Sequence, residues 1–247
     1  MSSNRLLKLG NIVAFLITIV VNSLANILPL NGITTGELSD LYGNLFTPAG
    51  YVFSIWGVIY LLLVVFSYYQ YGADDSLHDR IDILFMVSCL FNIVWIFLWL
   101  YQYVFLSLFA MFGILGTLIL IYVRLGIGER EVSSSERNMV HLPFSVYLGW
   151  ITVAPIANVA AFLVSVGWDG FNQAAINMTV GMIVIAMALT LINTYTRGDV
   201  AYAAVIVWAL GGILQKQMDT PLIPQTARIA IVIIVIGVIV KKTGRLG

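Results

Sequence analysis

Residues 104–123 read VFLSLFAMFGILGTLILIYV, a run without a single charged side chain. As an α-helix, a run of this length crosses the roughly 30 Å hydrocarbon core of a membrane, because each residue adds about 1.5 Å. Lipid offers no partner to free backbone groups, so the run must be helical, and it is too long for a barrel strand. This stretch therefore predicts a transmembrane helix.

The rest of the chain repeats this pattern. Six runs, including the one quoted, are long enough to span a membrane: 11–30, 49–71, 81–101, 104–123, 141–166 and 175–195. Two shorter runs follow at 200–215 and 226–240. We therefore predict an all-α polytopic membrane protein with about eight transmembrane helices.

The start of the chain allows an alternative. Arg5 and Lys8 precede an apolar run and the small residues Ser23 and Ala25, a pattern typical of a cleavable signal. The run continues to Leu30, however, and a retained first helix gives the better distribution of charge. We therefore interpret it as the first transmembrane helix.

Composition excludes several classes of function. Hydrophobic residues make up 60% of the chain and charged residues 10%, and the mean hydropathy is +0.97, so the surplus apolar surface must face lipid. With a net charge of zero, no basic field can gather phosphates, which excludes nucleic acid as a partner. The single Cys89 and the distant His78 and His141 give no metal-ligand spacing, so no metal site is predicted. Neither a catalytic triad pattern nor a P-loop is present, and nothing is typical of a water-soluble enzyme.

Basic residues predict the orientation. If the amino terminus is cytoplasmic and successive loops alternate, ten of the twelve Lys and Arg lie inside, and Lys216 and Arg228 lie outside. The ten are Arg5, Lys8, Arg80, Arg124, Arg130, Arg137, Arg197, Lys241, Lys242 and Arg245. We therefore expect a multi-pass protein of the cell (plasma or inner) membrane with both termini in the cytoplasm. The longest outer connection, 31–48, is expected to cover a cavity that opens outward.

Ionisable residues are nearly absent from the centres of the predicted helices. Asp82 lies near the start of the third run, and Asp199 and Lys216 flank the seventh. Because intramembrane ionisable residues mark proton and ion pathways, their scarcity argues against a proton-coupled transporter.

Aromatic and amide side chains instead recur at helical spacing. Three stripes and one pair share helix faces: Phe53, Trp56 and Tyr60; Asn92, Trp95 and Trp99; Tyr147, Trp150, Ala154 and Asn158; and Asn22 with Asn26. One interpretation is that these amides join helices and the rings pack in the core or at the membrane interface. The other is that the faces converge on a cavity for a flat, mostly apolar ligand. Periodicity leaves both open.

The stretch FTPAGYVFSIWGVIY at residues 46–60 resembles the start of the second helix in the TspO/MBR family, the tryptophan-rich sensory or translocator proteins. Two further motifs agree with that family: Phe91-Asn92-Ile93-Val94-Trp95, and Tyr147-Leu148-Gly149-Trp150 followed by Asn158. The resemblance covers about residues 8–166, the length of the family's five-helix bundle. It therefore predicts a five-helix TspO/MBR-like bundle in residues 1–166 and a C-terminal transmembrane extension of about three helices in residues 167–247.

The resemblance implies a membrane receptor or carrier that binds a porphyrin, haem or a sterol-like lipid between the runs 11–30, 49–71, 81–101 and 141–166. The candidate ligand-binding residues are Tyr51, Phe53, Trp56, Tyr60, Asn92, Trp95, Tyr147, Trp150, Asn158, Asn22 and Asn26. Their rings would stack on the ligand, and their amides would hydrogen-bond its polar edge. No catalytic residue and no resident cofactor is predicted; porphyrin or haem is expected as a ligand, beside membrane lipid.

Alternatives remain at this point. A light-dependent modification of porphyrin through Trp56 or Trp150 would make the protein an enzyme. A secondary transporter for a small apolar or zwitterionic solute is suggested by Pro155 and the pair Gly211-Gly212, since broken helices often line substrate paths. A purely structural subunit is a third interpretation, and a homodimer is among the assemblies open to such a protein.

Overall fold

The computed structural model describes residues 3–28, 30–81, 83–220 and 222–244. Asp82 and Arg245, named above, lie outside the described residues. Throughout the described ranges, the regular structure is helical. The elements are α1 (Ser3–Ile27), η1 (Leu30–Gly32), α2 (Thr35–Leu41), η2 (Gly50–Ser54), α3 (Ile55–Gly72), α4 (Asp75–Ile81), α5 (Leu84–Leu100), α6 (Val104–Leu125), α7 (Ser134–Glu136), η3 (Arg137–His141), α8 (Leu142–Ser165), α9 (Gln173–Arg197), α10 (Val200–Lys216) and α11 (Leu222–Thr243).

Apolar helices occupy all eight predicted positions, which confirms an all-α polytopic membrane protein. Six described helical stretches are long and apolar enough to cross a membrane: Leu6–Ile27, Gly50–Gly72, Val104–Leu125, Ser134–Ser165, Gln173–Arg197 and Leu222–Thr243. The other two, α5 and α10, have 17 residues each, at the lower end of spanning length.

Two lengths differ from the sequence prediction. The run 81–101 was expected to be long, but α5 begins only at Leu84. The run 226–240 was expected to be short, but α11 has 22 residues because it begins at Leu222. Pro224 lies in its first turn, where a missing N–H costs the helix nothing.

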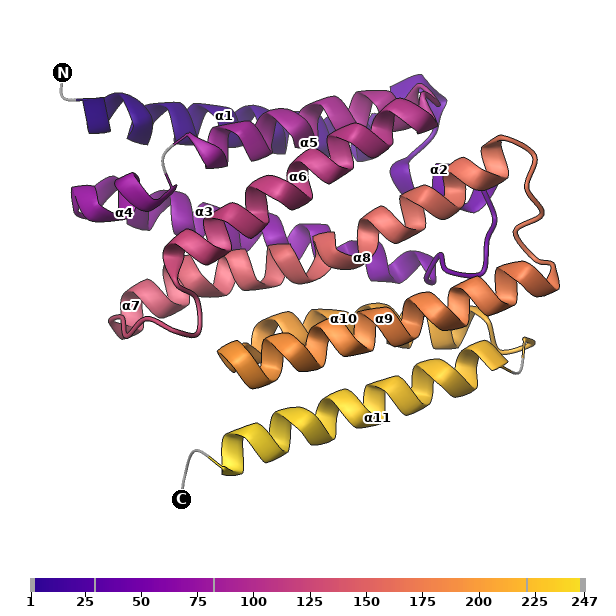
Figure 1. Cartoon of the computed structure of the whole chain (residues 1–247). Coiled ribbons are helices and arrows are strands. Elements are labelled where there is room, and N and C mark those ends of the chain that lie inside the picture. Colours follow the sequence, from indigo (N-terminus) through magenta and orange to yellow (C-terminus); the bar gives the residue numbers. More distant parts are fainter. Residues whose placement is uncertain (1–2, 29, 82, 221, 245–247) are drawn as a thin grey trace.

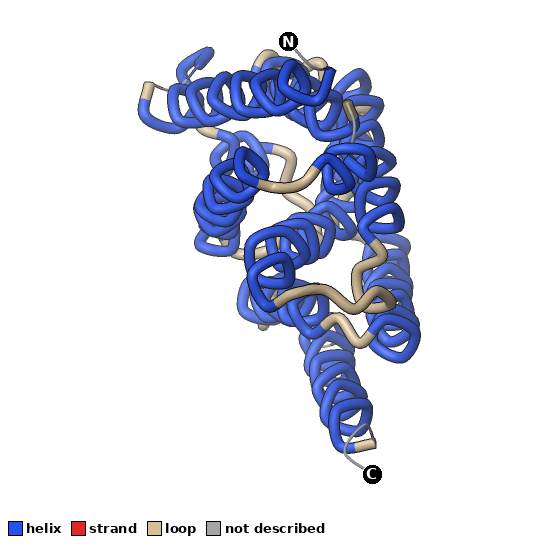
Figure 2. Tube along the Cα trace, turned by 90° about the vertical axis from the view of Figure 1, so that its left-hand side faces the viewer, coloured by secondary structure: helices blue, strands red, loops and turns tan. Residues whose placement is uncertain are grey.

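The helices form two groups that lie side by side (Figure 1). In the first, α5 packs between α1 and α6, and α8 packs against both α6 and α3. In the second, α9, α10 and α11 pack against one another, and α10 joins them to the first group through α8. Figure 2 shows how the helices run side by side, with α11 at the edge that carries the carboxyl terminus. The helix α8 therefore connects the two groups.

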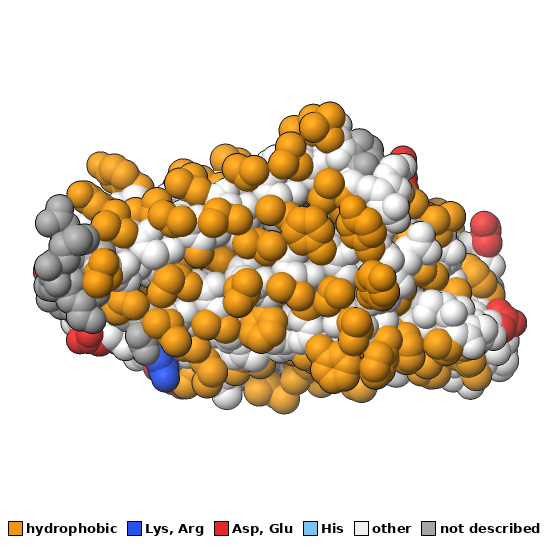
Figure 3. Space-filling view, turned by 90° about the horizontal axis from the view of Figure 1, so that it is seen from above, with side chains coloured by type: hydrophobic (Ala, Val, Ile, Leu, Met, Phe, Trp, Pro, Cys, Tyr) orange, Lys and Arg blue, Asp and Glu red, His pale blue; other side chains and the backbone are white. Residues whose placement is uncertain are grey.

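The surface along the helices is apolar. On the face seen in Figure 3, hydrophobic side chains cover the length of the helices, and charged side chains lie only near the two ends. Large apolar side chains such as Leu61, Phe109 and Ile192 are exposed. Soluble proteins rarely expose contiguous apolar surface on this scale, so this surface faces lipid.

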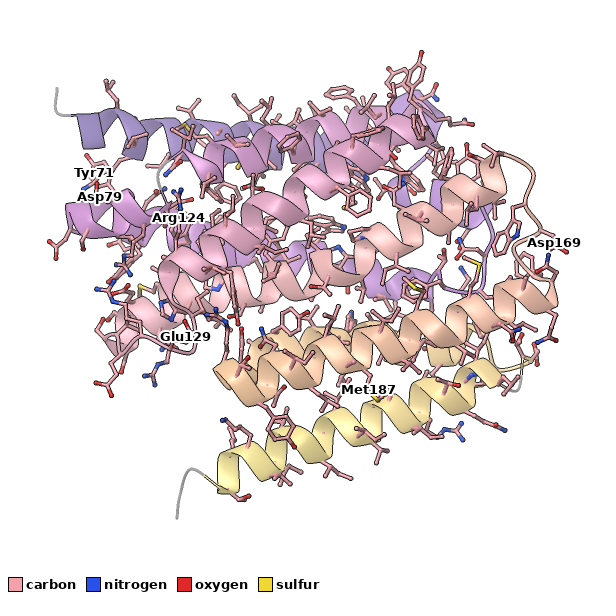
Figure 4. The ribbon with its side chains drawn as sticks, viewed as in Figure 1. Tyr71, Asp79, Arg124, Glu129, Asp169 and Met187 are labelled. Carbon is pink, nitrogen blue, oxygen red and sulfur yellow. The ribbon has the colours of Figure 1, made fainter. Side chains whose placement is uncertain are left out.

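Charged pairs gather at the two ends of the bundle. Arg80 pairs with Glu136 at 3.0 Å and Arg197 with Glu129 at 3.2 Å at one end. Tyr71, Asp79, Arg124 and Glu129 lie at this end, and Asp169 lies at the opposite end (Figure 4). Both chain termini lie at the same end (Figure 1), as an even number of crossings requires. Which end faces the cytoplasm stays a prediction.

Candidate ligand-binding site

Trp56 on α3 is the centre of an aromatic cluster. Its ring stacks on Tyr60 and Trp95, with centroids 5.7 and 6.0 Å away, and meets Tyr147 and Trp150 edge-on at 6.0 and 6.2 Å. The side chains come from α3, α5 and α8, so the three predicted stripes meet in space. Such a pair is worth about 0.5–1.5 kcal/mol beyond its buried area, so the cluster stabilises the bundle itself.

The cluster continues at both ends. Trp99, one turn from Trp95, stacks on it at 6.2 Å with an angle of 14° between the rings. Phe53 from η2 meets Trp150 edge-on at 5.9 Å. Trp95, Trp99 and Trp150 are buried, so these rings form a continuous apolar wall inside the bundle.

A small cavity of about 50 Å³ lies against this wall. Five of the predicted site residues line it: Phe53, Trp56, Trp95, Trp150 and Asn158. The other lining residues are Thr35, Ser39, Phe46, Pro48, Trp99, Met111, Val153, Ala154, Ala157, Ala209 and Ile213. The volume holds about two water molecules at roughly 30 Å³ each, whereas a small-molecule site needs at least about 300 Å³. The rings are therefore closed on one another.

Some polar groups of this cavity have hydrogen-bond partners within the described chain, and one does not. The indole Nε1–H of Trp95 donates to the Asn158 Oδ1 at 2.9 Å, and the Asn158 Nδ2 donates to the Ser107 Oγ at 3.0 Å. The Asn158 amide is thus engaged by the chain itself. The indole Nε1–H of Trp150 is buried and has no acceptor in the described part of the chain. A buried donor without a partner costs about 1–3 kcal/mol, so Trp150 brings an unpaired polar group to the wall of this cavity. The Tyr60 hydroxyl, beside the cavity, is also buried without a partner among the described residues.

Four of the predicted residues form a polar core beside the cavity instead of lining it. The Asn22 Nδ2 donates to the Asn92 Oδ1 at 2.7 Å, and the Asn92 Nδ2 donates to the Tyr147 hydroxyl at 3.3 Å. Tyr60 lies in the same region, stacked on Trp56. This chain of hydrogen bonds joins α1, α5 and α8, where each bond is worth roughly 0.6–2 kcal/mol.

The last two predicted residues lie further out. The Asn26 Oδ1 accepts a hydrogen bond from the Thr35 Oγ1 at 3.4 Å, so Asn26 contacts the segment that covers the cavity. Tyr51 is 45% exposed and meets Trp208 of α10 edge-on at 5.2 Å. The structure therefore does not bring Tyr51 into the cavity.

The short helix α2 covers the cavity, as expected of the 31–48 segment. Thr35 and Ser39 on α2 line the cavity, and the Thr35 carbonyl accepts a hydrogen bond from the Trp99 indole at 3.2 Å. The helix begins with a capping box, in which the Thr34 Oγ1 accepts from the Glu37 N–H and the Glu37 carboxylate accepts from the Thr34 N–H. The hydrogen bonds from the Thr34 backbone and side chain lower the pKa of Glu37.

The helix α10 forms a wall of the cavity that the sequence did not predict. Ala209 and Ile213 line the cavity, and the Gly212 carbonyl accepts a hydrogen bond from the Ala49 N–H at 3.2 Å. A Cβ at Gly212 would overlap the Val52 Cγ2, so only glycine permits this close approach. The cavity is therefore lined by α10 as well as by helices of the predicted five-helix bundle.

Two helices expected to be broken are continuous. The helix α10 runs through Gly211 and Gly212, and α8 runs through Pro155. The sequence signal at Gly212 marks close packing against η2, not a break. The two continuous helices therefore give no support to a transporter with broken helices. The sequence indicated Trp99 only through its place in the stripe with Asn92 and Trp95, and the α2 residues only through the outer connection 31–48. Nothing in the sequence indicated Ala209 or Ile213.

Comparison with known proteins gives one match. A family model described as TSPO-like protein matches residues 8–240. The matched range includes α9 and α10 and most of α11, well beyond residue 166. No curated protein matches the chain, and no solved structure matches it either. Division of the chain into parts at residues 166 and 167 stays a prediction.

Proposed function

The chain belongs to the family of TSPO-like proteins, and on this premise we propose that it binds a flat, mostly apolar ligand in the aromatic cavity. The ligand we propose is a tetrapyrrole such as a porphyrin, with a sterol-like lipid as the related alternative. A tetrapyrrole offers a broad π-face to the indoles and carboxylate oxygens at its edge. The protein is thus a multi-pass membrane protein of the ligand-binding, translocator type.

The observation that carries the proposal is the unpaired Nε1–H of Trp150. It lies in the wall of a cavity that is otherwise aromatic and aliphatic. Removing this donor from water without an acceptor is costly, and a ligand oxygen within reach would recover that cost. A carboxylate would do so more strongly than a neutral acceptor, because charge-assisted hydrogen bonds are about twice as strong.

Ligand entry requires the cavity to widen from its volume of about 50 Å³. Leu38 of α2 is buried in the hydrophobic core, and the segment around it makes further, polar contacts at its edges. These are the bond from Trp99 to Thr35, the bond from Tyr42 to Gln102 at 3.3 Å and the ion pair of Asp40 with Lys216 at 2.6 Å. An exposed ion pair is worth about 0–1 kcal/mol, and α2 is a short helix of seven residues, so we propose that α2 is the wall that moves. We place the entrance there.

A fluorescence titration tests the proposal. Purified protein in nanodiscs is titrated with protoporphyrin IX while tryptophan quenching is followed, for the native chain and for Trp150→Phe. Loss of the indole N–H removes a hydrogen bond of about 1 kcal/mol, or somewhat more to a carboxylate, and should weaken affinity roughly fivefold to tenfold.

The matched control is Trp168→Phe, since Trp168 does not line the aromatic cavity. Its affinity for protoporphyrin should equal that of the native chain. Trp208 is a poor control, because its indole donates to the Val52 carbonyl at 3.2 Å and so contacts η2. Equal affinities for the native chain and Trp150→Phe would contradict the proposed site.

A further inference from the structure

A second, larger cavity lies between α6, α8 and α9. Its volume is about 310 Å³, within the range of small-molecule sites. Among the described residues, it shares Phe46 alone with the lining of the aromatic cavity. Its walls are apolar, with Phe112 and Leu115 on α6, Ile156 on α8 and Met182 on α9. These walls lie on stretches that are long and apolar enough to cross a membrane, so a hydrocarbon chain fits their chemistry.

One end of this cavity lies at the connection between α8 and α9. Trp168 and Gly170, in the connection between α8 and α9, line it there, and Asp169 lies between them in the chain. Figure 4 shows Asp169 at this end of the bundle. The helix α9 begins here, and its cap Asn172 accepts from the Ala175 N–H at 2.9 Å. A helix of 25 residues presents a partial positive charge at its start.

Deeper in the cavity, Thr179 supplies a hydroxyl. Thr179 is only 5% exposed and lines the cavity. It lies about 9 Å from the start of α9, at roughly 1.5 Å per residue. On the α8 wall, Pro155 and Ile156 line the cavity. A hydroxyl on a mostly apolar wall can donate a hydrogen bond to a ligand oxygen.

We propose that the cavity holds one acyl chain of a zwitterionic phospholipid from the surrounding bilayer. The acyl chain lies between α6, α8 and α9, and its ester oxygen accepts from the Thr179 hydroxyl. The phosphate faces the start of α9, and the ammonium group lies by the Asp169 carboxylate and the face of Trp168. The positive ammonium group thus lies by an acidic side chain, and the negative phosphate lies by the partial positive charge at the start of a helix. A fatty acid has only a negative charge, so it would leave the Asp169 carboxylate without a counter-charge. This inference does not depend on the proposed porphyrin site.

Photochemical labelling tests the inference. The protein is placed in nanodiscs of phosphatidylcholine that carries a diazirine on one acyl chain, irradiated, digested and analysed by mass spectrometry. We expect labels to concentrate on α8 and α9 peptides that carry the lining residues. Ala160→Leu fills the cavity and should lower this labelling severalfold. The matched control Ala204→Leu, in the open groove between α3 and α10, should leave it unchanged.

A second variant tests the charge of the headgroup without filling the cavity. Asp169→Asn keeps the side-chain oxygen that accepts from the Phe171 N–H at 2.9 Å and removes the charge. It should reduce labelling by phosphatidylcholine and leave labelling by diazirine-bearing phosphatidic acid, which has no ammonium group, unreduced.

Three results would overturn the inference. They are labels spread evenly over the lipid-facing helices, unchanged labelling in both Ala160→Leu and Asp169→Asn, and loss of labelling when oleic acid competes at equal concentration. Trp150→Phe should retain the α8 and α9 labels even if its porphyrin affinity falls. Failure of one site is therefore distinguishable from failure of the other.

Discussion

At the scale of single residues, Gly212 decides how closely α10 approaches the aromatic cavity. An added Cβ would overlap the Val52 Cγ2 and lie 3.0 Å from the Pro48 Cβ. Gly212→Ala should therefore overpack the contact and destabilise the protein by about 1–3 kcal/mol. A thermal melt of the purified protein, followed by circular dichroism, measures this change.

Gly211 provides the matched control. It precedes Gly212 in the same helix, and a Cβ there would meet nothing within 4 Å. Gly211→Ala should leave the melting temperature unchanged or raise it, since alanine favours the helix by about 1 kcal/mol over glycine. Equal melting temperatures for the two variants would show that α10 does not press against η2.

Asn158 was predicted from the sequence to contact the ligand, whereas in the structure it bonds to side chains of other helices. Its amide accepts from the Trp95 indole and donates to Ser107, so both its oxygen and its nitrogen are already engaged by neighbouring side chains. Asn158→Ala should leave the buried Trp95 donor unpaired and lower stability by about 1–3 kcal/mol. Protoporphyrin affinity, measured under conditions where the variant is folded, should change less than in Trp150→Phe.

The comparison variant is Ser107→Ala, which removes a single partner of Asn158 and keeps the bond from Trp95. It should cost less stability than Asn158→Ala. If Asn158→Ala instead weakened porphyrin binding strongly at unchanged stability, the amide would be a ligand contact. The spacing of Tyr147, Trp150 and Asn158 predicts that they share a face; it does not predict which polar groups another helix already occupies.

At the scale of elements, the stability of α2, which covers the cavity, should depend on pH. The folded pKa of Glu37 is lowered by its bonds to Thr34, so these bonds stabilise α2 at pH values above the ordinary pKa of 4.5. That stabilisation is lost as the pH falls through the lowered pKa, because the protonated carboxyl no longer accepts both bonds. Association of protoporphyrin should therefore become faster as the pH falls below the ordinary pKa of 4.5 and through the lowered pKa of Glu37.

Stopped-flow quenching at several pH values measures this rate. Glu37→Gln carries no titrating carboxyl at this position, so its association rate should vary much less between pH 6 and pH 3.5 than that of the native chain. Parallel pH profiles for the two proteins would rule out Glu37 as the group that loosens α2. The capping box was readable at Thr34 and Glu37 only once the start of α2 was known, because the segment shows no apolar periodicity.

At the scale of the whole molecule, both termini lie at the end that carries Arg124 and Glu129, opposite Asp169 (Figure 4). With the basic residues counted as above, that end is predicted to face the cytoplasm. Single cysteines at Thr243 and Asp169 should react with a membrane-impermeant maleimide from opposite sides. The native Cys89 is buried and should stay silent.

In intact cells, we expect Asp169→Cys to react and Thr243→Cys to react only after the membrane is permeabilised. Reaction of both positions in intact cells would contradict the two-ended arrangement. The reverse pattern would preserve the fold and invert the orientation.

Much of the architecture was predictable because lipid leaves a long apolar run such as 104–123 no alternative to a helix. The convergence of Trp56, Trp95 and Trp150 was predictable from their spacing. The contribution of α10 was not, because Ala209 and Ile213 are ordinary apolar residues whose position depends on packing between distant segments. Tyr51 shows the converse: it lies within the motif in sequence, yet it faces Trp208.

The stacking of Trp95 between Trp56 and Trp99 gives the protein a built-in optical signal. The ring centroids are 6.0 and 6.2 Å apart and the interplanar angles are 27° and 14°. Transition dipoles held this closely exchange excitation, so the absorption of these indoles is a property of the group. Near-ultraviolet circular dichroism of the ligand-free protein should therefore show a strong paired band. A molecule that inserts between the rings will uncouple them, so its binding can be detected without a label.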